Sequence, residues 1–107
     1  MGHEMALAIA HAGADVILTG RDAASLEKTA ADIRHLAHQA VPIPADMGNT
    51  SECETACKTA LTENGHINIL INNVGGRREN IPAQDMPLDT WYKFMDLNLT
   101  SAFLCTK

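Results

Sequence analysis

The stretch Ile67-Asn68-Ile69-Leu70-Ile71-Asn72-Asn73-Val74-Gly75 decides the fold of this 107-residue chain. Its first five residues form an apolar run with the length of a buried strand. Two side-chain amides follow the run and can tie neighbouring strand ends together. The glycines at positions 75 and 76 allow a backbone to approach a flat ligand closely. The stretch therefore predicts a buried strand followed by a turn that a ligand can approach.

Helix and strand patterns alternate before this stretch. Apolar spacing predicts a helix over Gly2–Ala12 and a short buried strand over Val16–Leu18. Asp22 is a suitable N-cap for a helix whose apolar residues keep helical spacing as far as Ala37. The extended segment Val41–Pro44 has two prolines, which cannot donate to a strand ladder, and is predicted to lie at a sheet edge.

Two further helices complete the alternation. Asn49, with Glu52 three residues later, resembles a capping box, and Gly65 ends the helix that it begins. After a loop to Pro87, Asp89 is expected to cap a last helix. Three strands alternating with four helices are typical of an α/β fold with a doubly wound parallel sheet, because right-handed crossovers make such strands parallel.

Composition excludes several classes of partner. Eight basic residues against 13 acidic ones give a net charge of −5, and the only basic pair is Arg77-Arg78, so no nucleic acid is expected. This pair could steer an anionic substrate, or it could simply be part of a solvated loop. No apolar stretch approaches the roughly 20 residues that span a bilayer, and the first residues lack a secretory leader. We expect no membrane association.

The three cysteines, Cys53, Cys57 and Cys105, are an odd number and too few for a disulfide framework. A reducing, cytoplasmic location is the natural interpretation. Cys53 and Cys57 are four residues apart and share a helix face, so a metal site is conceivable. No second ligand pair stands at a zinc-like spacing, and we expect apolar packing and no metal.

Asn72-Asn73-Val74-Gly75 resembles the Asn-Asn-Ala-Gly signature of the short-chain dehydrogenase/reductase family, with Val74 in the usual alanine place. The resemblance implies a Rossmann-like fold and a nicotinamide cofactor. It also implies that Asn72 helps to hold the central sheet together, while Asn73, Val74 and Gly75 lie along the cofactor's ribose. A generic turn at a strand end is the alternative.

The resemblance assigns three more residues to the cofactor. Gly2 looks like the last glycine of Thr-Gly-x-x-x-Gly-Ile-Gly. Arg21 follows Gly20, at the place where an acidic residue would bind the ribose of NAD(H); an arginine there favours NADP(H) over NAD(H). Asp46 corresponds to the aspartate that bonds the adenine amino group. The alternatives are a solvated arginine for Arg21 and a turn or cap residue for Asp46.

Asn98 corresponds to the asparagine of the family's catalytic tetrad, which helps to hold a water that relays protons to the active-site lysine. An exposed helix asparagine is the alternative. The family's general acid/base is a tyrosine with a lysine four residues later, but the only tyrosine here, Tyr92, is followed at that spacing by Asp96. The serine of the triad also has no counterpart, because Ser25, Ser51 and Ser101 fall in predicted helices or at their starts.

Residues 1–107 are therefore expected to be a partial NAD(P)-binding Rossmann-type domain, with an incomplete doubly wound parallel sheet that lacks its first strand. The flanking strands would then either pair directly or fail to form one sheet. The isolated chain is expected to be marginally stable or partly unfolded, and inactive. The intact enzyme would act on a small-molecule alcohol or carbonyl substrate and form a homo-oligomer through the apolar last helix. A non-catalytic nucleotide-binding or interaction remnant is the alternative; a receiver-type domain is disfavoured because only Asp46 is a suitably placed acid.

Overall fold

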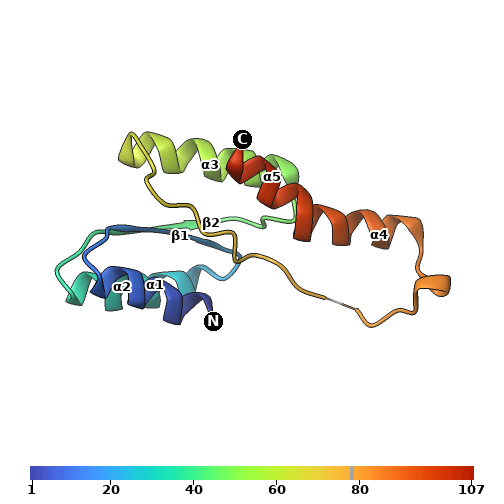
Figure 1. The fold of residues 1–107 in the computed structure, drawn as a ribbon, viewed down its shortest axis with the longest axis horizontal. Coiled ribbons are helices and arrows are strands. Elements are labelled where there is room, and N and C mark those ends of the chain that lie inside the picture. Colours follow the sequence, from blue (N-terminus) through green and yellow to red (C-terminus); the bar gives the residue numbers. More distant parts are fainter. Residues whose placement is uncertain (78) are drawn as a thin grey trace. The chain divides into compact units, whose positions relative to one another are not determined.

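The computed structural model describes residues 1–77 and 79–107, so Arg78 of the predicted basic pair lies outside the described residues. The chain divides into two compact units, Met1–Ala45 and Asp46–Lys107, here called unit 1 and unit 2. Helices and a parallel sheet confirm the predicted α/β class (Figure 1). Within the described residues, no helix has both the length and the apolar character needed to cross a bilayer.

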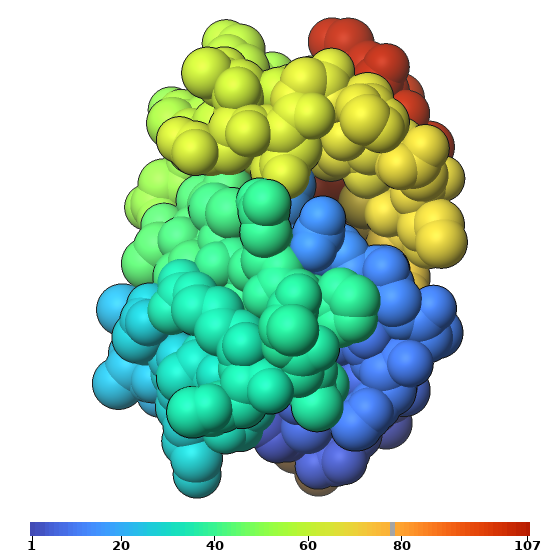
Figure 2. All heavy atoms as spheres, turned by 90° about the vertical axis from the view of Figure 1, so that its left-hand side faces the viewer, coloured from blue at the N-terminus to red at the C-terminus, as the bar shows by residue number. Residues whose placement is uncertain are grey.

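Unit 1 is a two-stranded parallel sheet covered by two helices. Its elements are α1 (Gly2–His11), β1 (Val16–Gly20), α2 (Ala23–His35) and β2 (Ala40–Pro44). The strands pair in register from Val16 opposite Ala40 to Gly20 opposite Pro44. Figure 1 shows both helices on the same face of the sheet, and in Figure 2 the blue residues of unit 1 lie directly against its cyan and green ones. The core between them is formed by small and branched apolar residues: Ala6, Ala10, Ala30, Ile33 and Ala40.

The start of α2 follows the prediction, and its end does not. The Asp22 carboxylate accepts hydrogen bonds from the backbone N–H groups of Ala24 and Ser25, as an N-cap should. The helix ends at His35, and Ala37 lies beyond it with a positive φ of 65°. Ala37 thus occupies the left-handed position that commonly ends a helix, and its N–H is bonded to the Arg34 carbonyl.

Unit 2 is mainly helical. It contains α3 (Thr50–Asn64), a 3₁₀ turn η1 (Ala83–Asp85), α4 (Leu88–Met95), η2 (Asp96–Thr100) and α5 (Ser101–Thr106). The last three follow one another without a break, and η2 is a π-helical segment, so the predicted last helix exists with a wider turn in its middle. α3 packs against α5.

Two predicted caps in unit 2 need correction. Asn49 caps α3 by accepting from the N–H groups of Ser51 and Glu52, but Glu52 does not reach back to Asn49. Its carboxylate instead accepts the N–H of Asp46, because the preceding turn brings that group closer. Asp89 lies in the first turn of α4 rather than at its cap, since the helix already begins after Pro87.

The predicted third strand is wrong. Residues 67–71 form no strand, and the sheet consists of β1 and β2 alone among the described residues. Ile69 is 68% exposed. A strand exists only where a neighbour pairs with its backbone, and in a doubly wound sheet this one pairs with the first strand. No described segment pairs with residues 67–71, and β1 pairs with β2 instead.

Candidate functional site

Asn98 binds the loop that follows the Asn-Asn-Val-Gly stretch. Its Oδ1 accepts the Gly76 N–H at 2.8 Å, and its Nδ2 donates to the Gly76 carbonyl at 3.1 Å. Nδ2 also donates to the Phe94 carbonyl, one turn earlier, at 2.9 Å. The side chain is exposed to solvent, yet these contacts hold it in one orientation. Asn98 lies in the π-helical segment, a feature that occurs frequently at functional sites.

Gly75 makes this contact possible. A Cβ at this position would lie 3.0 Å from Asn98 Oδ1, too close for any other residue without a shift. Gly76 has a φ of 148°, which an L-residue with a side chain rarely adopts. A side chain at position 75 would crowd the Asn98 amide, and one at position 76 would strain the backbone, so glycine suits both positions where the loop meets the helix. The structure thus brings together Gly75 and Asn98, two residues that the sequence singled out separately.

Asp46 begins a turn that packs beside the same helical segment. Its Oδ1 accepts the Gly48 N–H at 3.0 Å, and its carbonyl accepts the Asn49 N–H at 2.8 Å. A Cβ on Gly48 would lie 3.4 Å from a methyl carbon of Leu97, the residue before Asn98. Asp46 therefore has the turn role proposed as its alternative, and it also lies close to η2.

The other residues of the Asn-Asn-Val-Gly stretch make fewer or longer hydrogen bonds than Asn98 does. Asn73 donates its backbone N–H to the Ile71 carbonyl at 3.1 Å, and Val74 is exposed. The Asn72 amide donates to Thr106 Oγ1 over a long 3.4 Å. Asn72 was predicted to hold a central sheet together, but here it reaches the end of α5, because no sheet is formed beside it.

Two predicted cofactor residues belong to unit 1. Arg21 follows the last residue of β1 and is exposed, and Gly2 is the first residue of α1. Gly20 and Pro44, the last residues of the two strands, are paired at one edge of the sheet. In open α/β sheets, ligands bind outside the carboxyl ends of the strands, which is where Arg21 lies.

The one tyrosine is not placed for acid/base chemistry. Tyr92 lies exposed on α4, and Lys93 pairs with Asp89 rather than with the phenol. Ser25, Ser51 and Ser101 lie in α2, α3 and α5, as the sequence predicted.

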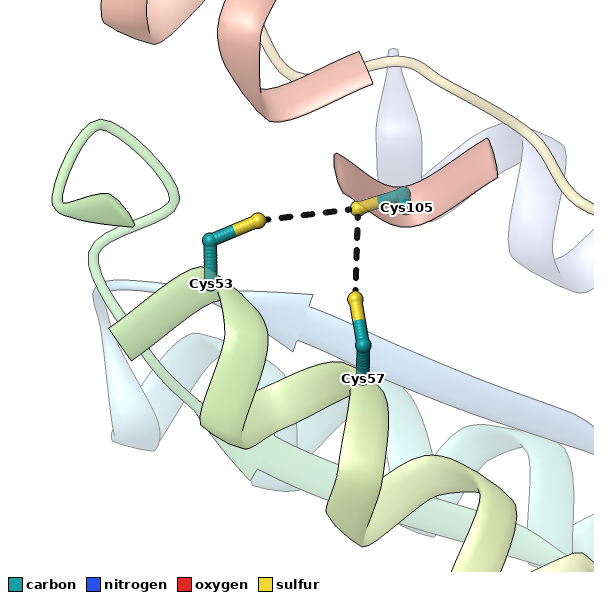
Figure 3. A group of neighbouring side chains, drawn as sticks. All are labelled: Cys53, Cys57 and Cys105. Atoms are coloured by element: carbon teal, nitrogen blue, oxygen red, sulfur yellow. Dashed lines mark hydrogen bonds between the residues drawn. The ribbon is translucent and has the colours of Figure 1, made fainter. Parts of the chain in front are cut away.

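Cysteines form a cluster that the sequence did not reveal. Cys105 Sγ lies 3.8 Å from the Cys53 sulfur and 3.7 Å from the Cys57 sulfur (Figure 3). Burial raises the pKa of the Cys53 thiol and raises the pKa of Cys105 to about 12. The helical spacing of Cys53 and Cys57 indicated that these two thiols share a helix face, but only the packing of α3 on α5 adds Cys105.

Comparisons with known proteins agree with the sequence resemblance. The model of the family described as short chain dehydrogenase matches residues 1–107, so the chain belongs to that family. A 3-oxoacyl-[acyl-carrier-protein] reductase of Synechocystis is 32% identical over 108 residues, which cover 100% of this chain and 43% of the relative. The chain thus spans less than half the length of this relative.

Solved structures show the same relationship. A 3-ketoacyl-ACP reductase from Sinorhizobium meliloti 1021 superimposes with a TM-score of 0.87 at 27% identity, over 99% of this chain and 42% of its own. The NADH-dependent reductase A1-R′ in complex with NAD gives a TM-score of 0.88 at 26% identity, over 98% of this chain and 44% of its own. Both support a Rossmann-like arrangement of the elements present here.

Proposed function

We propose that residues 1–107 are a partial NAD(P)-binding Rossmann-type domain of an oxidoreductase. The complete enzyme would move a hydride between a nicotinamide cofactor and the carbon of an alcohol or ketone. Membership of the short-chain dehydrogenase family supports this reaction class. The observation that carries the proposal is the two-way hydrogen bonding of Asn98 to Gly76, immediately after Asn73, Val74 and Gly75.

The residues present are suited to hold the cofactor and to position a proton path. Gly75 allows the loop to approach closely, and Asn73 and Val74 offer backbone groups along a ribose. An amide oxygen can accept two hydrogen bonds, so Asn98 Oδ1 can accept one from a water while it holds the Gly76 N–H. The cofactor, when bound, supplies the hydride chemistry. The contribution of Asn98 is to orient the loop and that water.

Arg21 supports a preference for NADP(H) over NAD(H). It is an exposed cation at the carboxyl end of β1, and Gly20 beside it leaves room for a 2′-phosphate. Asp46 would accept from the adenine amino group, and Gly2 would remain from the glycine loop. Because the related reductase A1-R′ uses NADH, the preference must be tested directly.

A chimera tests the reaction. The 108-residue segment of the Synechocystis reductase that matches this chain is replaced by residues 1–107, so that the rest of that enzyme supplies what this chain lacks. We expect ketone reduction with NADPH, and a kcat lowered by roughly a hundredfold in Asn98→Ala. Asn64→Ala is the matched control, because Asn64 also donates its side-chain amide to a carbonyl four residues earlier but lies in α3.

Several outcomes separate the alternatives. A chimera that binds NADPH but does not reduce substrate would favour a non-catalytic nucleotide-binding module. An Asn98→Ala chimera with unchanged kcat would remove Asn98 from the proton path. In the same chimera, Arg21→Ala should raise the KM for NADPH by roughly 10- to 100-fold and leave that for NADH unchanged. Equal effects on both cofactors would reject the NADP(H) preference.

We further propose that the intact enzyme is a cytoplasmic homo-oligomer. Free cysteines suit a reducing compartment. Apolar side chains are exposed along the last helix, notably Leu99 and Phe103, and such a stripe is typical of a surface covered by another subunit. Phe103→Glu should lower the sedimentation coefficient of the intact enzyme. An unchanged coefficient would reject this surface as the interface.

A further inference from the structure

The three thiols of unit 2 converge although they are far apart in the sequence. Cys53 and Cys57 project from the same face of α3 toward Cys105 on α5 (Figure 3). Their sulfur atoms all lie within 4.8 Å of one another. Cys53 is fully buried, and the other two are partly buried. They therefore form one compact group of potential ligands.

Helix packing explains why they meet. Residues four apart lie one above the other on a helix, which aligns Cys53 with Cys57. The side chains beside them are small: Ala56 and Ala60 are buried on α3, and Ser101 is buried on α5. Small residues allow the two helices to approach closely, and the Cys53 thiol lies 3.8 Å from the Ser101 carbonyl oxygen.

The sulfur separations suit a shared metal better than a bond between two sulfurs. A disulfide requires about 2.05 Å between sulfur atoms, whereas the two measured separations are 3.7 and 3.8 Å. A zinc–thiolate bond is about 2.3 Å, so two sulfurs at tetrahedral positions around zinc lie about 3.8 Å apart. We propose that Cys53, Cys57 and Cys105 form a binding site for a soft, thiophilic metal ion, Cu(I) or Zn²⁺.

The donor set determines this class of metal. Among the described residues, the group contains sulfur ligands only, with no imidazole or carboxylate. Thiolates select Cu(I) and zinc over magnesium, calcium and manganese, which prefer oxygen. Structural zinc sites almost always have four protein ligands, whereas Cu(I) is satisfied by fewer, so three cysteines, each of which releases its thiol proton to solvent when it binds the metal, favour Cu(I). Zn²⁺ would need a water or a further group in the fourth position.

A metal at this position would join α3 to α5. The helix that contains α5 also contains Asn98, two turns before Cys105. The metal would stabilise unit 2 because it binds the packed helices and not the separated ones. The site is independent of the proposed oxidoreductase function, and either can fail without the other.

The test titrates the 107-residue chain with Cu(I) and, separately, with Zn²⁺ under anaerobic conditions, with a phosphine reductant that keeps the thiols reduced. We expect saturation at one ion per chain and a higher thermal midpoint. Cys105→Ala should weaken binding by roughly a hundredfold or more, because it removes the ligand that only the fold supplies. Thr55→Ala is the matched control, since Thr55 lies between the cysteines on α3 and should leave binding unchanged.

Three results would overturn the site. If Cys105→Ala bound the metal as tightly as the native chain, the site would consist of only two thiols on one helix. If binding were undiminished in concentrated urea, the fold would not be what assembles the site. If neither ion saturated the chain at one equivalent, the thiols would only pack against one another. Saturation by Cu(I) alone, or by Zn²⁺ alone, identifies which metal the site takes.

Discussion

Two segments that the sequence predicts as buried strands differ in the structure. Residues 16–20 form β1, paired along their length with β2, and the run at 67–71 is unpaired and exposed. Both have the composition of a buried strand. The difference shows that apolar composition permits a segment to form a strand. Whether the strand forms depends on a neighbouring strand that pairs with its backbone.

The two units also differ in how they bury apolar surface. In unit 1, branched side chains such as Ile33, Val16 and Leu18 pack between the helices and the sheet. In unit 2, the buried residues of α3 are small (Cys53, Ala56 and Ala60), and the larger buried apolar side chains, Met47 and Leu97, lie outside that helix. Since burial of larger apolar side chains contributes more, and Ile33 is the largest fully buried side chain among the described residues, Ile33 should make the largest single contribution.

The largest expected effect is a difference in amide hydrogen exchange between the two runs. Amides of β1 that donate to β2 should exchange about a thousandfold more slowly than those of residues 67–71, because the ladder must open first. Exchange measured residue by residue by NMR checks this. Comparable protection in both runs would mean that the second run does find a strand partner in solution.

The next effect concerns buried and exposed isoleucines. Ile33→Ala should destabilise unit 1 by about 3 kcal/mol, because Ile33 has no exposed surface and leaves a cavity. Ile69→Ala removes the same atoms from an exposed side chain and should change the stability by less than about 0.5 kcal/mol. Urea unfolding followed by circular dichroism measures both. Equal effects would contradict the placement of Ile33 in the core of unit 1.

Local signals predicted most of the fold. The α3 cap at Asn49, the α2 cap at Asp22 and the helix stop at Gly65 were all readable because they depend on residues within a few positions. The strand at 67–71 was predicted wrongly because strand formation depends on a distant partner. The end of α2 was missed because an alanine, Ala37, occupies a position usually given to glycine.

The candidate site was predictable as a set of residues but not as a set of contacts. The sequence singled out Gly75 and Asn98, which lie 23 positions apart, without indicating that the Asn98 amide would bind the Gly76 backbone. No sequence pattern indicated the π-helical segment Asp96–Thr100. The third cysteine was missed for the same reason, because helix packing, and not spacing, brings Cys105 to the other two.

A smaller effect is expected when one glycine in each unit is replaced by alanine. Gly75→Ala would place a Cβ 3.0 Å from Asn98 Oδ1 and should cost about 1–2 kcal/mol, the scale of one or two lost hydrogen bonds. Gly20→Ala meets only a flexible Leu26 side chain at 3.5 Å and should be tolerated. Chemical shifts of the Asn98 side-chain amide report the first change. Unchanged shifts in Gly75→Ala would show that the loop does not depend on this glycine.

The smallest expected effect is a difference in how the stability of the α2 and α3 N-termini depends on pH. Hydrogen bonds from Ser25, first from its side chain and then from its backbone, hold the pKa of Asp22 below its ordinary value of 3.8. A carboxylate whose pKa is lower in the folded state contributes stability above pH 3.8 and loses it as the pH falls through the folded value. The Asn49 cap does not titrate.

Amide exchange should therefore show α2 fraying more than α3 as the pH is lowered from 5 toward 3, roughly the range in which such carboxylates titrate. Asp22→Asn keeps a cap that does not titrate and should abolish that difference. If α2 in Asp22→Asn still frayed on acidification as in the native chain, another group would be responsible.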